Sequence, residues 1–222
     1  MHHQAGLPRL FIHGAGRRGA AAWPSFGASD GRFVSFAPDA SIEDQVEELL
    51  DLVDSPVLVF AHSIGAVPAV LAASEREDIV GLVLVEPALY DIARGRESIE
   101  RHIGIVTEAR SRADAGSLRG FWSILRPLMF GGPLDAARWG DERALAERWA
   151  TTNLPWGHGI RARMISGIPT LVVTGGWNDE YEQIAGILQD VGATHVTLPG
   201  AQHRPQDLPD FARIVSGFEH AL

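Results

Sequence analysis

Ser63 stands where an apolar strand gives way to a short apolar helix, a position from which a serine hydroxyl can act as a nucleophile. Residues 57–61 (VLVFA) are uninterrupted apolar residues, which is typical of a strand buried on both faces of a parallel sheet. The turn HSIG follows at 62–65, and residues 66–73 form an apolar segment of helical length. Small residues two positions before and after the serine complete the nucleophile-elbow pattern of strand, sharp turn and helix. The pattern predicts that the turn lifts the hydroxyl of Ser63 clear of the sheet.

A glycine-rich turn and a histidine accompany this elbow. Upstream, the apolar segment 7–12 ends in HGAG at 13–16, where glycines allow the backbone to aim its N–H groups at a ligand. Downstream, His203 stands in the sequence PGAQHRP. Together, these segments resemble the α/β-hydrolase superfamily, and the resemblance covers nearly the whole chain apart from its middle. The resemblance implies an esterase-like serine hydrolase with a helical cap.

A serine hydroxyl is a weak nucleophile at its free pKa, so Ser63 needs a base within hydrogen-bond reach and a group that orients the base. His203 follows the last expected strand and precedes the last expected helix, which is where the family carries its catalytic histidine. We therefore expect His203 to be the base.

Two carboxylates compete for the role of the acid that orients this histidine. Asp179 follows the last strand but one, which matches the usual acid loop of the family and gives the chain order Ser, Asp, His. Glu86 is the alternative, because it ends the segment LVLVEP and some family members carry the acid after that strand. Either carboxylate satisfies the chemistry. We take Asp179 as the first candidate.

Backbone N–H groups are expected to form the oxyanion hole. The elbow pattern assigns one donor to Ile64, the residue after the nucleophile. The resemblance implies that the second donor is Ala15, within the HGAG turn.

Six apolar segments alternate with helix-like segments and so predict a doubly wound, mostly parallel α/β sheet of about six strands. The expected strands are 7–12, 32–37, 57–61, 79–85, 169–174 and 194–198. The expected helices around them are 42–53 with Ser41 as its N-cap, 66–73, 184–191 and 207–222.

Members of the family normally open with two additional antiparallel strands, and we expect this sheet to lack them. The strand that contains Phe33 would then lie at the sheet edge. An unpaired apolar edge has to be covered or paired. We therefore expect a covering segment or a homodimer at this edge.

Residues 87–164 interrupt the alternation with helix-like stretches at 99–113, 117–128 and 142–151. The resemblance implies that this segment is a helical cap. We therefore divide the chain into a hydrolase core, residues 1–86 and 165–222, and a cap, residues 87–164.

The composition limits the partners and the chemistry. A net charge of −9 over 222 residues argues against a nucleic-acid partner. Because no apolar run approaches the ~20 residues that span a bilayer and the N-terminus resembles no secretory signal, we expect a cytoplasmic protein without a membrane partner. The chain has no cysteine, which excludes disulfides and thiolate chemistry. No metal-ligand spacing, phosphate loop or dinucleotide fingerprint is present, so we expect no cofactor and no metal.

These observations predict a carboxylesterase-like serine hydrolase that cleaves a small ester, thioester or related acyl substrate through a Ser-His-Asp triad and an acyl-enzyme intermediate. One alternative is a C–C bond hydrolase or lyase that uses the same triad. Another is a ligand-binding protein that has the hydrolase fold without catalysis, because fold does not dictate chemistry.

Overall fold

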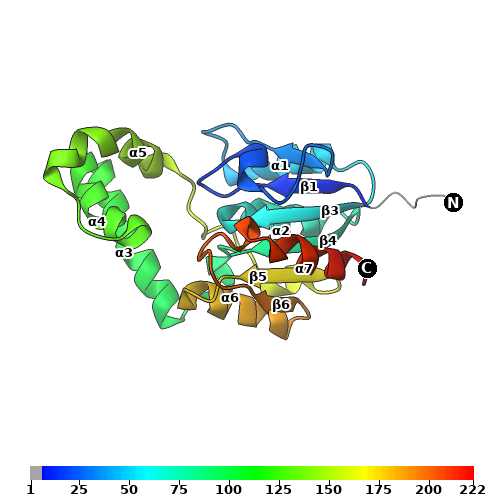
Figure 1. Ribbon diagram of the computed structural model, residues 1–222. Coiled ribbons are helices and arrows are strands. Elements are labelled where there is room, and N and C mark those ends of the chain that lie inside the picture. The colour runs from blue at the N-terminus through cyan, green and yellow to red at the C-terminus, as the bar shows by residue number, and fades with distance from the viewer. Residues whose placement is uncertain (1–6) are drawn as a thin grey trace. The chain divides into compact units, whose positions relative to one another are not determined.

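A six-stranded parallel sheet forms the centre of the protein, and the computed structural model describes it within residues 7–222. The strands lie in the order β2-β1-β3-β4-β5-β6, and every neighbouring pair is parallel (Figure 1). Their bounds are β1 Arg9–Ile12, β2 Arg32–Val34, β3 Val57–His62, β4 Ile79–Val85, β5 Thr170–Thr174 and β6 Thr194–Thr197. The doubly wound sheet that the alternation predicts is confirmed.

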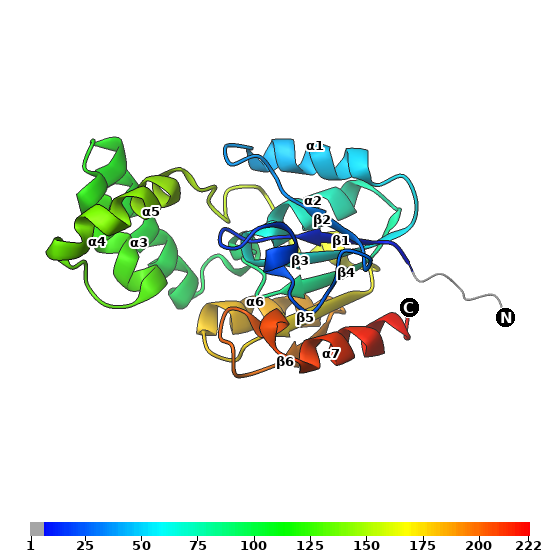
Figure 2. The same ribbon diagram turned by 45° about the horizontal axis from the view of Figure 1, so that its top comes forward.

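The central strands are apolar because both of their faces are covered. Every residue of β3 is buried, although successive side chains along a strand point to opposite faces of the sheet. On one face an aromatic cluster contains Phe11 of β1, Phe60 of β3 and Trp23, with Phe211 from the last helix packed against them. Figure 2 shows that helix, α7 (Asp210–Glu219), on the opposite side of the sheet from α1 (Ile42–Leu52) and α2 (Ala66–Glu75).

Helix ends follow local capping chemistry. Ser41 caps α1 in a capping box with Asp44, as the sequence predicts. The helix α6 (Asp179–Asp190) begins five residues before the expected start at 184, because the side chain of Asn178 accepts a hydrogen bond from the N–H of Glu180 and caps it. The last helix begins later than expected, after a 3-10 turn at Pro205–Asp207.

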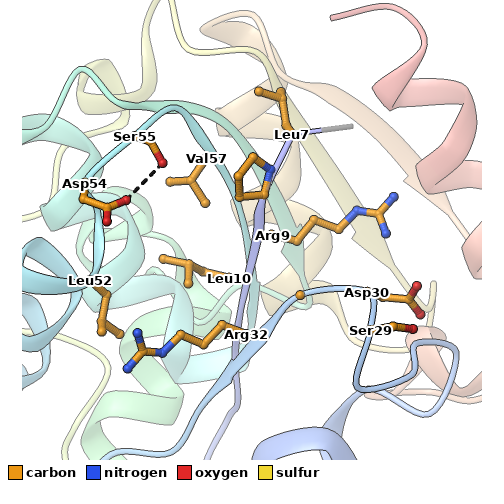
Figure 3. Close-up of a pocket in the computed structure, with 12 residues that line it drawn as sticks. Leu7, Arg9, Leu10, Ser29, Asp30, Arg32, Leu52, Asp54, Ser55 and Val57 are labelled. Carbon is orange, nitrogen blue, oxygen red and sulfur yellow. Dashed lines mark hydrogen bonds between the residues drawn. The ribbon is translucent and has the colours of Figure 1, made fainter. Parts of the chain in front are cut away.

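The edge strand β2 is only three residues long. Its central residue, Phe33, is half-buried and stacks on Phe11 of β1 with ring centroids 4.7 Å apart. The edge position predicted for this strand is confirmed. A cavity of about 530 Å³ opens nearby (Figure 3), and it is lined by Leu7, Pro8, Arg9, Leu10, Ser29, Asp30, Gly31, Arg32, Leu52, Asp54, Ser55 and Val57. Because these residues lie at or before the amino ends of their strands, the cavity is at the opposite end of β3 from Ser63.

Residues 94–153 form a second compact unit. It consists of α3 (Glu97–Asp114), α4 (Leu118–Phe130) and α5 (Trp139–Thr151). Within it, the carboxylate of Glu142 accepts hydrogen bonds from Nε1 of Trp122 at 2.6 Å and from Nε of Arg126 at 2.9 Å, which joins α5 to α4.

The second unit is narrower than the predicted cap, residues 87–164, because the flanking segments belong to the sheet unit. The carboxylate of Asp91 accepts hydrogen bonds from the backbone N–H groups of Gly157, His158 and Ile160. These three bonds tie the returning chain to the segment that leaves β4. No helix within residues 7–222 has both the length and the apolarity that crossing a membrane requires.

Candidate active site

Ser63 lies at the sharp turn between β3 and α2. Its φ of +55° is in the left-handed region, which is uncommon for a residue with a side chain. The turn continues as a 3-10 segment, Ser63–Gly65, and then as α2. The strand, turn and helix expected around this serine are therefore present, and the side chain is partly accessible while its neighbours on β3 are buried.

Two glycines let the HGAG turn lie directly against this elbow. A Cβ added at Gly65 would lie 2.6 Å from the backbone oxygen of His13. A Cβ added at Gly14 would lie 2.9 Å from both Nδ1 of His62 and Cβ of Ser63. Any side chain at either position would separate the two turns. Ala15 therefore follows a residue that packs against Ser63, and the assignment of its N–H and that of Ile64 to an oxyanion hole stays a prediction.

His203 lies beside Glu86. The Nδ1 atom of the imidazole is 3.3 Å from Oε2 of the carboxylate. Glu86 is fully buried at the end of β4, where its φ of +46° turns the side chain toward the end of β5. There the carboxylate also accepts hydrogen bonds from the N–H of Gly175 at 2.5 Å and from Nε1 of Trp177 at 3.0 Å. Three donors thus satisfy a carboxylate that would otherwise be costly to bury.

The structure does not bring Asp179, the first candidate for the acid, to His203. Asp179 is exposed and is the first residue of α6. Because Asn178 is the N-cap, Asp179 occupies the first turn, where a carboxylate interacts favourably with the positive end of the helix. The predicted pairing of Asp179 with the histidine is therefore corrected to Glu86, the alternative named from the sequence.

Backbone strain is concentrated around these residues. Within residues 7–222, the residues other than glycine with positive φ are Ser63, Glu86 and Gln202, the last being adjacent to His203. Each such conformation costs on the order of 1–3 kcal/mol and persists only where the surroundings enforce it. Strain at three points of one constellation is a signature of functional sites.

His62 holds the loop that carries His203. Its Nε2 donates a hydrogen bond to the backbone oxygen of His203 at 2.9 Å, and the two rings lie 4.8 Å apart. Burial lowers the pKa of His62 well below its usual value, and the neighbouring His203 lowers it further. Burial also lowers the pKa of His13, whose Nδ1 is 2.7 Å from the backbone oxygen of Gly14. Both rings are therefore neutral supports of the site.

Sequence reasoning missed two tyrosines at this site. The ring of Tyr181 lies 5.0 Å from that of His203, and Tyr90 is buried at the start of the 3-10 turn that follows β4. The hydroxyl of Tyr90 donates to Oε2 of Glu180 at 2.5 Å. Burial raises the pKa of both phenols, so both stay protonated at neutral pH. The sequence signal that could have drawn attention to them is their rarity, because the chain contains two tyrosines in all.

The site combines a serine hydroxyl at a strained turn with an imidazole that lies beside a buried carboxylate. No group of three or more carboxylate, imidazole or thiol side chains suited to a metal ion occurs in the described part of the chain.

Comparison with known proteins places this geometry in context. The sequence model of the "Alpha/beta hydrolase family" matches residues 4–213. A comparison by sequence with proteins of curated function finds no match.

Solved structures resemble the chain over nearly its whole length. An alpha/beta hydrolase from Sphaerobacter thermophilus has 23% identity and a TM-score of 0.61, and the match covers 96% of this chain and 92% of that chain. A structure reported among carboxylesterases of Nitrososphaera gargenis has 14% identity and a TM-score of 0.62, covering 98% and 91%. MenH from S. aureus has 14% identity and a TM-score of 0.61, covering 97% and 94%. At these identities the likeness shows the fold alone.

Proposed function

This chain belongs to the alpha/beta hydrolase family, and we propose that it is a serine hydrolase in which Ser63, His203 and Glu86 form the catalytic triad. The observation that carries this proposal is the 3.3 Å contact between Nδ1 of His203 and a buried carboxylate. The serine at the strained elbow follows His62, whose ring binds the backbone oxygen of His203. An imidazole whose Nδ1–H is donated to a carboxylate presents an unprotonated Nε2, which is the form that acts as a general base.

The reaction would proceed through an acyl-enzyme. Oγ of Ser63 attacks the acyl carbon of the substrate while Nε2 of His203 accepts the hydroxyl proton. The bond to the leaving group then breaks, and the imidazolium gives that proton to the leaving oxygen or sulfur. Water attacks the acyl-enzyme with His203 again as base, which releases the acid and regenerates the serine. Glu86 stabilises the imidazolium at each stage and stays ionised.

The tetrahedral intermediates carry a negative charge that needs donors. We assign this role to the backbone N–H groups of Ile64 and Ala15, one at the start of the elbow and one in the turn packed against it. Removal of one such donor typically costs about 10²–10³ in kcat. Because every step is an acyl or proton transfer, these residues carry out the reaction themselves.

A small carboxylic ester, a thioester or a related acyl compound suits this chemistry best, and we propose carboxylesterase-like activity. The triad attacks acyl carbons, and the leaving group needs only the proton that His203 returns. The alternatives are a C–C bond hydrolase or lyase with the same triad and a binding protein without catalysis.

Intact-mass labelling with a fluorophosphonate tests the proposal without a known substrate. The serine oxygen forms a bond to phosphorus, fluoride leaves, and His203 takes the proton. We expect one adduct on the wild type and none on Ser63→Ala, with labelling of His203→Ala slowed at least 10³-fold. An unlabelled but folded wild type would refute an activated serine, and labelling that persists in Ser63→Ala would identify a different nucleophile.

A panel of short-chain esters and thioesters then separates the enzyme classes. Turnover of simple esters with loss of activity in Ser63→Ala supports the esterase assignment. Labelling without ester or thioester turnover would favour the C–C hydrolase or lyase alternative.

A further inference from the structure

The indole of Trp177 and the imidazole of His203 share one oxygen of Glu86. Nε1 of Trp177 donates a hydrogen bond to Oε2 at 3.0 Å, and Nδ1 of His203 lies 3.3 Å from the same atom. The other oxygen, Oε1, accepts from the N–H of Gly175 at 2.5 Å. Of the two donors on Oε2, the indole is therefore closer than the imidazole that the proposed reaction uses.

This sharing affects the histidine because Glu86 is completely buried. A buried anion beside an imidazole favours the protonated ring, which cannot act as a base. A donor that binds the anion takes up part of its charge and weakens its attraction for the imidazolium. A carboxylate that also binds Trp177 and Gly175 thus favours the protonated imidazole less than one bound to His203 alone.

Three other titratable side chains flank the imidazole, and none of them replaces this effect. The ring of His62, at the end of β3, lies 4.8 Å away and stays neutral because burial lowers its pKa. The ring of Tyr181, in α6, lies 5.0 Å away and stays protonated because burial raises its pKa. The adjacent Arg204 is paired with Asp207 through hydrogen bonds of 2.8 and 2.7 Å. The charge on Glu86 is therefore the one that the imidazole contacts directly.

Trp177 reaches the carboxylate from the turn between β5 and α6. Its ring lies edge-on to that of His203, with centroids 6.1 Å apart, and at the same distance from that of Tyr181. The residue is nevertheless 44% exposed. Because so much of the indole faces solvent, burial of apolar surface does not account for its position, whereas the hydrogen bond to Glu86 does.

We propose that Trp177, by sharing Oε2 of Glu86 with His203, keeps the imidazole an unprotonated base at a lower pH than the buried carboxylate would otherwise allow. The inference rests on the proposed function, because it assumes that His203 is the base of the triad. Trp177 is a positioning residue, since it acts through Glu86.

The pH dependence of fluorophosphonate labelling in Trp177→Phe tests this. Phenylalanine keeps a ring beside His203 but has no N–H to donate. A hydrogen bond of ordinary net strength corresponds to about 0.5–1 pH unit. We expect the midpoint of the labelling rate to rise by this amount. Relative to the wild type, the rate should then fall about three- to tenfold between a pH above both midpoints and a pH below them.

The matched control is Trp139→Phe, which removes an indole N–H at the start of α5, in the second compact unit. It should leave the midpoint where the wild type has it. An unmoved midpoint in Trp177→Phe of wild-type melting temperature would overturn the proposal. A rate that changes by the same factor at every pH would do so as well, because displacement of the histidine or of the reagent has no such pH dependence.

Two measurements test the route through Glu86. In Glu86→Gln there is no carboxylate charge to share, so adding Trp177→Phe should not move the midpoint further. A shift as large as that in the presence of Glu86 would show that the indole acts by another route and would overturn the assignment. In the wild type, the assigned indole N–H resonance of Trp177 should move with the same midpoint as the labelling rate. A resonance that stays in place while the rate titrates would refute the shared acceptor.

The outcomes separate this inference from the proposed function. If the wild type and Trp177→Phe both remain unlabelled at every pH, there is no activated serine, and both proposals fail. If both are labelled with the same midpoint, the triad stands and the role of Trp177 is refuted.

Discussion

The Nδ1 atom of His203 lies 3.3 Å from Oε2 of Glu86, although 117 positions separate the two residues in the sequence. The parallel sheet brings them together, because Glu86 ends β4 and the loop of His203 lies against the end of β5, the neighbouring strand. Glu86 is completely buried, and its remaining oxygen capacity is used by Gly175 and Trp177. Its role in the proposed reaction leads to the first prediction.

We expect Glu86→Gln to lower kcat/KM, or the labelling rate, by about 10²–10⁴. The amide cannot stabilise the imidazolium and can impose the wrong tautomer on His203. Asp179→Asn is the matched control, since Asp179 is exposed at the start of α6 and should change the rate by less than twofold. Rates for both variants under identical conditions decide the matter. A loss confined to Asp179→Asn would return the role of the acid to that residue.

The second prediction concerns Gly175. A Cβ at this position would overlap the backbone oxygen of Gln202, the residue before His203. Gly175→Ala should therefore destabilise the fold by about 1–3 kcal/mol, a cost typical of overpacking, and should displace the histidine. Urea unfolding measures the first effect and the labelling rate the second.

Gly186→Ala provides the comparison, because a Cβ at Gly186 meets no atom within 4 Å. Gly186 lies inside α6, where exchange of glycine for alanine typically stabilises by about 0.5–1 kcal/mol. If Gly175→Ala proved as stable as Gly186→Ala, the close approach of the two loops would be wrong.

The parts of the fold that depend on local pattern could be predicted from the sequence. The buried strand β3 and the helix α2 follow from the two apolar runs on either side of the turn that contains Ser63. The start of α1 could be predicted from Ser41 and Asp44, because their side chains form a capping box. The edge position of the strand that contains Phe33 followed from the resemblance to the family, which the match over residues 4–213 supports.

The choice between two carboxylates at neighbouring strand ends could not be made from spacing. Asp179 and Glu86 both follow parallel strands, so both are expected at the carboxyl ends of the strands, on the same side of the sheet. Their positions differ because the positive φ of Glu86 turns its side chain inward, whereas the cap at Asn178 makes Asp179 the first residue of a helix. Neither a backbone angle nor a helix start five residues earlier than expected is visible in the apolar pattern.

The presence of two tyrosines at the site could not be predicted for a related reason. Tyr90 and Tyr181 are 91 positions apart and belong to a 3-10 turn after β4 and to α6. Their position at the site depends on tertiary packing, and no local motif requires it.

The third prediction is a loss of stability in mild acid. The pKa of His62 is far below its usual value and that of His13 is lowered as well, both mainly through burial. Below pH ~6.5 the unfolded chain therefore binds more protons than the folded protein, and the free energy of unfolding falls as the pH falls. As long as one such ring stays neutral in the folded state, it lowers the free energy of unfolding by up to about 1.4 kcal/mol for each unit by which the pH falls.

Urea unfolding of wild type and His62→Gln between pH 5 and 7 measures this slope. Glutamine retains an N–H that can reach the backbone oxygen of His203 but does not titrate. The slope should therefore be smaller in the variant. An equal slope in both proteins would mean that His62 is protonated in the folded state.

The fourth prediction concerns the ionisation of the two tyrosines. Burial is the main cause that raises the pKa of each phenol above its usual value, and for Tyr90 the neighbouring Tyr181 adds to it. In the folded protein little tyrosinate should therefore form at pH 11, whereas the chain unfolded in denaturant should titrate near pH 10. Absorbance at the tyrosinate band follows this ionisation, and Tyr90→Phe and Tyr181→Phe each leave one phenol to observe.

Above pH ~10 the folded state holds more protons than the unfolded state, so the free energy of unfolding must fall as the pH rises, by up to about 1.4 kcal/mol per pH unit for each phenol. Tyrosinate absorbance that appears near pH 10 while the fold remains intact would show that these hydroxyls are open to water.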